Sequence, residues 1–246
     1  NVVLTLDLSG SMGWDGDAQT SGVQERLELA KDAIRDMLNS YDGMGDVSVK
    51  LTTFASSGSS SAWMSATDAM GVIEGLQASG RTNYEDAVYE TYTNFGTPPA
   101  ADRTIGFFIS DGEPTVENNE GRDASGNTGT DAQSGWLDSS YKDAWTSFAE
   151  NNLDELNIVG IGTGITNTTY LDMLGEADNG LVKVNVFVVE DVTQLSEYLT
   201  PKVEVASGNI MDNVDFGADG AGGLSAITID GQSYSADTFP ADGLNA

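Results

Sequence analysis

The stretch NVVLTLDLSGSM, residues 1–12, indicates the class of fold. Its first six residues are mostly apolar, as in a buried strand. Asp7, Ser9 and Ser11 then place an oxygen-bearing side chain at every second position. By itself this run is compatible with a helix cap, a phosphate-binding loop, a nucleophile or a metal site.

Apolar strands and segments of helical period alternate along most of the chain. The predicted strands lie at residues 1–7, 47–54, 61–66, 103–110, 156–164 and 181–190. The predicted helices lie at residues 23–41, 67–76, 84–95, 138–151, 168–175 and 192–200. This alternation predicts an α/β fold, with a doubly wound, mostly parallel, six-stranded sheet flanked by helices on both faces.

The sequence changes character in its last fifth. Residues 207–223 are rich in Gly and Asp, and residues 225–235 read as a β-hairpin with an Asp-Gly turn. We therefore expect an α/β domain over residues 1–200. Residues 201–246 are expected to form a linker and a short β-rich extension that leads to a following module of a longer chain.

The chain is strongly acidic. Its 246 residues include 39 Asp and Glu against 10 Lys and Arg, which gives a formal net charge of −29. Such a charge repels nucleic acids and anionic membranes, and it suits surroundings rich in salt or divalent cations. No apolar run is long enough to span a membrane. We expect neither a nucleic-acid partner nor membrane insertion.

Histidine and cysteine are both absent from the sequence. Their absence excludes the usual zinc sites, Ser-His-Asp and Cys-His catalysis, and a histidine general base. Any bound metal is therefore expected to be a hard cation held by oxygen atoms, with Ca²⁺ and Mg²⁺ as the candidates.

Two further polar segments are expected at the same edge of the sheet as Asp7. Asp111 follows a predicted strand, and Thr82 lies in a loop before a predicted helix. Because ligands of such sheets bind at the carboxyl ends of the strands, both residues should meet Ser9 and Ser11. Two carboxylates and three hydroxyls suit a hard divalent cation and leave room for a water or a partner's carboxylate.

These segments resemble a known family. DLSGS (7–11), GRTN (80–83) and FFISDGEPT (107–115) are similar to the three loops that form the metal-ion-dependent adhesion site of von Willebrand factor A domains. Residues 1–200 fit that family in the order and spacing of their elements. The resemblance implies a non-enzymatic adhesion domain whose cation binds an acidic group of a protein or glycan partner.

The resemblance also implies roles for individual residues. Ser9, Ser11 and Thr82 would bind the metal directly, and Asp7 and Asp111 directly or through water. Arg81 stands where the family often has glycine, so it is a candidate for steering an acidic ligand. The other candidates for positions around the metal ligands are Asn83, Gly112 and Glu113.

The acidity and the Gly/Asp-rich tail resemble a narrower group, the large repetitive RTX-type adhesins of bacteria. This resemblance implies a secreted or cell-surface bacterial protein that takes part in adhesion and biofilm formation. Additional calcium is a further hypothesis for two acidic regions that also read as solvated loops. Its candidate ligands are Asp123 and Asp131 in the insertion at 113–135, and Asp212, Asp215 and Asp219 in the tail.

Two other functions compete with adhesion. A strand that ends in Asp-x-Asp opens the haloacid-dehalogenase phosphatases, but Ser9 stands in place of the second acid and cannot perform its proton transfer. We therefore do not expect an enzyme. The alternative is a structural spacer whose cation stiffens the loops without meeting any ligand.

Overall fold

The structure is a computed structural model. It describes residues 1–15, 25–116, 137–163, 165, 167–176, 180, 182–200, 226–229 and 232–235. The chain divides into two compact units, Asn1–Lys202 and Val203–Ala246.

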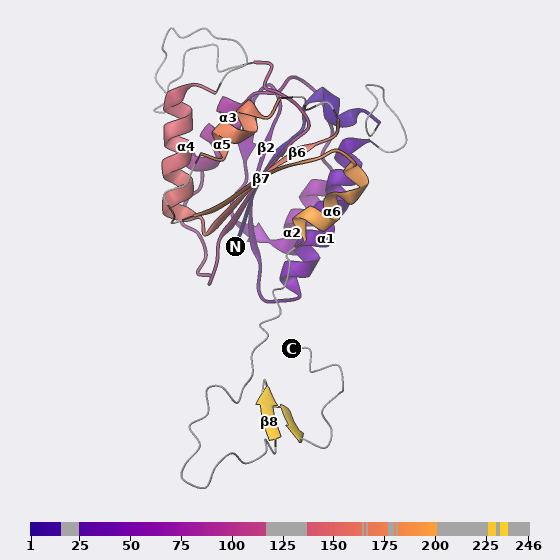
Figure 1. The fold of residues 1–246 in the computed structure, drawn as a ribbon, viewed down its shortest axis with the longest axis vertical. Coiled ribbons are helices and arrows are strands. Elements are labelled where there is room, and N and C mark those ends of the chain that lie inside the picture. The colour runs from indigo at the N-terminus through magenta and orange to yellow at the C-terminus, as the bar shows by residue number, and fades with distance from the viewer. Residues whose placement is uncertain are drawn as a thin grey trace. The chain divides into compact units, whose positions relative to one another are not determined.

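In the described residues, the first unit contains a sheet of seven strands. They are β1 (Val2–Asp7), β2 (Ser48–Phe54), β3 (Gly58–Ser60), β4 (Met64–Ser65), β5 (Ile105–Ser110), β6 (Glu155–Ile161) and β7 (Lys183–Val189). The order across the sheet is β3-β2-β1-β5-β6-β7, and β4 also pairs with β2. Figure 1 shows this sheet between helices, with β2, β6 and β7 labelled. Only β3 and β4 run antiparallel to their neighbour, so the predicted doubly wound, mostly parallel sheet is confirmed.

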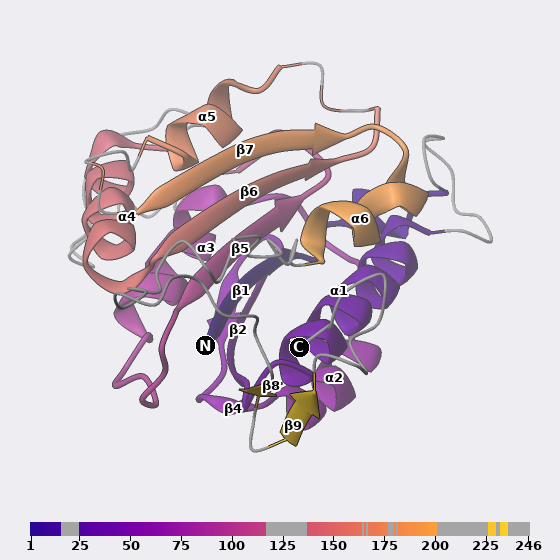
Figure 2. The same ribbon diagram turned by 60° about the horizontal axis from the view of Figure 1, so that its bottom comes forward.

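Helices cover both faces of this sheet (Figure 2). One face carries α1 (Arg26–Asp42), α2 (Ala66–Glu74) and α6 (Leu195–Leu199). The other carries α3 (Tyr84–Thr93), α4 (Ser139–Asn152) and α5 (Thr169–Leu174). Two short 3₁₀ helices, η1 (Gly10–Gly13) and η2 (Val192–Gln194), complete the described elements of the first unit.

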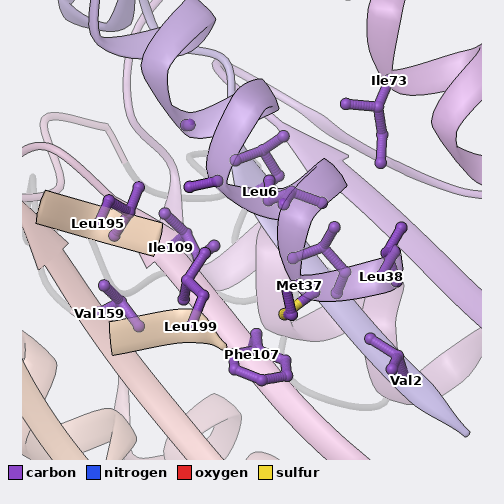
Figure 3. Close-up of a cluster of buried hydrophobic side chains, with 14 of the residues drawn as sticks. Val2, Leu6, Met37, Leu38, Ile73, Phe107, Ile109, Val159, Leu195 and Leu199 are labelled. Carbon is purple, nitrogen blue, oxygen red and sulfur yellow. The ribbon is translucent and has the colours of Figure 1, made fainter. Parts of the chain in front are cut away.

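The central strand β1 is buried on both faces, which explains its nearly continuous apolar sequence. Leu6 lies beneath α1 with Ile109 of β5 in the core shown in Figure 3. Leu4 belongs to the same core. Val3 faces the opposite layer and packs into an aromatic cluster around Trp145 of α4. The two cores fix the sheet between its helical layers and thereby fix the loops at its carboxyl edge.

Two local features differ from the sequence prediction. Residues 56–60 follow a predicted strand and have no predicted strand of their own, yet they contain β3, because its backbone pairs with β2 in a hairpin in which Ser59 lies opposite Thr53. The helix expected from residue 67 begins at Ala66. It is capped by Ser65, whose hydroxyl accepts a 3.1 Å hydrogen bond from the backbone amide of Asp68.

The second unit is described for two strands. β8 (Ala226–Ile229) and β9 (Gln232–Ser235) pair antiparallel, with Ile229 opposite Gln232. This pair falls within the hairpin predicted at residues 225–235. Among all described helices of the chain, none combines the length and the apolar character needed to cross a membrane.

Candidate metal centre

The carboxyl ends of β1 and β5 are neighbours because these two strands pair directly. The segment after β1 is joined to the loop before α3 by two backbone hydrogen bonds. The amide of Gly10 donates to the carbonyl of Gly80 at 3.0 Å, and the amide of Ser79 donates to the carbonyl of Leu8 at 2.7 Å. The first two of the three predicted loops are therefore held side by side.

Thr82 links the second loop to the third. Its carbonyl accepts hydrogen bonds from the amides of Thr115, at 2.8 Å, and Val116, at 3.1 Å. Its own amide donates to the Thr115 hydroxyl at 3.1 Å. Because Thr115 lies just beyond Asp111, the structure brings all three loops together at one edge of the sheet. Thr82 is 4% exposed there.

Asp7 ends β1 with a side chain that is inaccessible to solvent. Its Oδ1 atom accepts a 2.6 Å hydrogen bond from the backbone amide of Ser9. Its Oδ2 atom accepts another of 2.6 Å from the hydroxyl of Ser110. Both carboxylate oxygens are thus oriented by uncharged donors, so the negative charge of Asp7 itself is not paired by either contact.

Asp111 is the second buried carboxylate, at 2% exposure. Its Oδ1 atom accepts a 2.8 Å hydrogen bond from the hydroxyl of Ser11, which lies 3.1 Å from the hydroxyl of Ser9. Its Oδ2 atom lies 2.7 Å from Nη1 of Arg26, in an ion pair whose two side chains are almost wholly buried. Asp7, Ser9, Ser11 and Asp111 therefore form one cluster.

Burial raises the proton affinity of both carboxylates. Burial is the larger cause that raises the pKa of Asp7 to about 7, and the charge of Asp111 adds to it. Hydrogen bonds from Ser110 and Ser9 oppose this rise. Burial also raises the pKa of Asp111, although the hydrogen bonds from Arg26 and Ser11 favour its ionised form. A cation placed near both groups would relieve this cost by stabilising the ionised forms.

The other predicted residues surround this cluster with different exposures. Arg81 and Glu113 are exposed. Asn83 is buried and caps α3, since its side-chain oxygen accepts a 3.1 Å hydrogen bond from the amide of Asp86. The carbonyl of Gly112 accepts a 2.7 Å hydrogen bond from the Tyr84 hydroxyl.

The residues suggested for additional calcium, Asp123, Asp131, Asp212, Asp215 and Asp219, lie outside the described residues. Within the ranges that are described, no group of three or more His, Cys, Asp or Glu side chains could hold a metal. The candidate centre has two carboxylates, and the other oxygen atoms of its cluster belong to hydroxyl groups.

Sequence reasoning missed two residues of the site. Ser110 read only as the end of an apolar strand, and its position next to Asp111 was the one available signal. Arg26 lies within the helix predicted at residues 23–41 and is not among the predicted site residues, yet its guanidinium is buried against Asp111. Its chain separation of 85 residues from Asp111 left no local pattern to find.

The donor set fits a hard divalent cation. Two carboxylates, both buried, are joined by serine hydroxyls on one rim, and such oxygen donors are those that Ca²⁺ and Mg²⁺ prefer. Arg26 occupies one oxygen of Asp111, while the other oxygen is shared only with a hydroxyl. The cluster therefore offers a cation oxygen atoms from more than one loop.

The described architecture is of the von Willebrand factor A type. Residues 2–113 match the family model of the von Willebrand factor type A domain. The sequence has no significant match among curated proteins.

Solved structures of similar fold include two pilus proteins. The PilB minor pilin from Streptococcus sanguinis has 17% identity and a TM-score of 0.59, over 80% of this chain and 59% of the pilin. The pilus adhesin SpaC from Lactobacillus rhamnosus GG has 16% identity and a TM-score of 0.57, over 80% of this chain and 29% of the adhesin.

A third similar structure is proximal thread matrix protein 1 from the mussel byssus, solved with a zinc-occupied MIDAS motif. It has 13% identity and a TM-score of 0.52, over 81% of this chain and 46% of that protein. The chain thus spans less than two thirds of each of these three proteins, and at such identities the likeness establishes the fold.

Proposed function

We propose that this chain contains an adhesion domain that binds its ligand through one divalent cation, Ca²⁺ or Mg²⁺. Asp7, Ser9, Ser11, Thr82 and Asp111 would hold the cation. The observation that carries this proposal is the single hydrogen-bonded cluster formed by the two buried carboxylates and the two serines, in which the Ser11 hydroxyl reaches Asp111 at 2.8 Å.

The expected ligand carries an exposed carboxylate, on a protein or a glycan. Of the five side chains proposed to hold the cation, only Asp7 and Asp111 are charged. The cation would therefore still attract that carboxylate into its coordination shell. The remaining residues hold the three loops in place through backbone hydrogen bonds, such as those between Gly10 and Gly80 and between Thr82 and Thr115. These contacts support a preorganised site rather than one assembled by the ligand.

An extracellular or cell-surface role in a bacterium is part of the proposal. The similarity to a pilin and a pilus adhesin supports a protein-binding role within a larger chain. The strong negative charge, −29 in total, suits an environment with abundant cations. We further propose that the parent protein belongs to the large repetitive adhesins of the RTX type, a hypothesis that rests on the acidity and the Gly/Asp-rich tail.

A calorimetric titration of the chelator-treated chain with Mg²⁺ and Ca²⁺ tests the metal site. We expect saturable binding that Asp111→Asn removes and that Asp143→Asn, the same change at an exposed position of α4, leaves intact. The chain is then passed over carboxylate-coated and amine-coated beads, with cation or with chelator.

Retention on the carboxylate beads only when cation is present would support adhesion. Cation binding without such retention would instead favour a structural spacer, whose cation stiffens the loops without meeting a ligand. An absence of cation binding in the unaltered chain would reject the proposed site.

A further inference from the structure

Arg26 places a fixed positive charge inside the candidate metal centre. Its Nη1 atom lies 2.7 Å from Oδ2 of Asp111, and both side chains are excluded from solvent. It is the first residue of α1, so its position follows from the packing of that helix on the sheet. The charge is therefore part of the scaffold of the site and not a mobile surface group.

Two neighbours fix the guanidinium. At Gly162, which follows β6 with a φ of +83°, an added Cβ would lie 3.2 Å from Nε and 3.3 Å from Cζ of Arg26. Cζ also lies 5.7 Å from the ring centroid of Trp14, whose carbonyl accepts a hydrogen bond from the Arg26 amide. Arg26 could leave this position only by giving up these contacts, so we expect it to remain when a cation binds.

The fixed charge changes the electrostatic balance of the loaded site. Bound metal requires both carboxylates in their ionised form, which gives Asp7 and Asp111 two negative charges. Among Asp7, Asp111, Arg26 and the cation, Arg26 cancels one of the two negative charges, so a divalent cation leaves these groups with an excess of one positive charge. An uncompensated charge in a buried site is costly, and an anionic group bound to the cation removes that cost.

We propose that Arg26 makes cation binding and carboxylate binding mutually dependent, by leaving the cation-loaded site one negative charge short of neutrality. This inference rests on the proposed function and assigns to Arg26 the selection of anionic over neutral ligands. Because binding linkage is reciprocal, a bound carboxylate should increase the affinity for the cation by the same factor by which a bound cation increases the affinity for the carboxylate.

The test compares cation affinity in sodium acetate and in sodium chloride at equal ionic strength, with Mg²⁺ and Ca²⁺ as the titrants. In the unaltered chain we expect acetate to tighten cation binding by about fivefold or more, the lower end of typical coupling. Arg26→Met should bind the cation more tightly than the unaltered chain in chloride, and it should lose the acetate effect. Arg26→Lys, which retains the charge, should keep that effect.

Arg103→Met is the matched control, since it removes an arginine that pairs with Glu155 at the amino ends of β5 and β6, the edge of the sheet opposite the site. It should leave the acetate effect unchanged. Circular dichroism of each variant in saturating cation checks folding, and the measurement on the unaltered chain stands even if Arg26→Met does not fold. An unaltered chain that binds cation without any acetate effect would overturn this inference alone. A chain that binds no cation would overturn the proposed function as well.

Discussion

The hydroxyl of Ser110 donates a 2.6 Å hydrogen bond to Oδ2 of Asp7, and both residues are inaccessible to solvent. This contact joins the last residues of the paired strands β1 and β5. Ser110 and the backbone amide of Ser9, two uncharged donors, orient this carboxylate, and Ser110 belongs to the sheet itself. The candidate centre therefore depends on the sheet as well as on its loops.

Ser110→Ala should destabilise the domain. The substitution leaves one buried oxygen of Asp7 without its donor, which typically costs about 1–3 kcal/mol. Chemical denaturation in chelator measures this change. The control is Ser196→Ala, which removes an exposed hydrogen bond from a serine to Asp36 and should change stability by less than about 0.5 kcal/mol. Equal effects of the two variants would show that the buried contact contributes little.

Thr82→Ala should remove cation-dependent retention on carboxylate beads while the domain stays folded. The backbone hydrogen bonds of Thr82 hold the loops together and do not involve the deleted hydroxyl. We expect an unchanged melting temperature in chelator and a smaller rise on adding cation. Thr93→Ala, on the exposed side of α3, serves as the control. Retention of the variant equal to that of the unaltered chain would exclude Thr82 from the metal shell.

The metal-free domain should lose stability as the pH rises from about 4 to about 7. The pKa of Asp7 is about 7 in the folded protein, above its ordinary value of 3.8, so the folded state binds this proton more tightly. The stability that this proton contributes is therefore fully present at pH values below the pKa of Asp7 in the unfolded chain. It is lost as the pH rises through the pKa of Asp7 in the folded protein. Melting temperatures across this range in chelator check the trend, and Asp7→Asn should flatten it. An unchanged slope in the variant would assign the effect to other groups.

Leu4→Ala tests the core that supports the site. Leu4 is fully buried in the central strand, and such truncations cost about 2–5 kcal/mol. Val72→Ala on α2 removes a side chain that is 46% exposed and should cost less than about 0.5 kcal/mol. Denaturant midpoints of both variants give the comparison. A cost for Leu4→Ala as small as that for Val72→Ala would contradict the described packing of β1.

Arg81→Met should slow the association of an anionic ligand without lowering the affinity for the cation. Arg81 is exposed on the loop that carries Thr82, so its charge acts on an approaching anion through solvent. Surface-plasmon measurements on a carboxylated chip, at low and high salt, should show a lower association rate that converges with the unaltered chain as salt rises. A change in calorimetric cation affinity would instead place Arg81 in the site itself.

Most elements of the fold were predictable because their signals are local. The apolar spacing of α1 at Leu27, Ala30 and Ile34 matches the residues that the core buries. By contrast, β3 consists of Gly58, Ser59 and Ser60, which have little intrinsic preference for strands. Its backbone pairing with β2 decides its conformation, and no side-chain pattern reports that pairing.

The candidate site divides in the same way. The sequence by itself determined the oxygen-bearing residues of the three loops, because the end of each apolar segment marks where a loop begins. Only the tertiary structure decided how their charges are balanced. Asp111 meets Arg26 from a distance of 85 residues along the chain, through the packing of α1 against the sheet. Such a contact depends on the positions of whole elements in space, and local sequence carries no record of it.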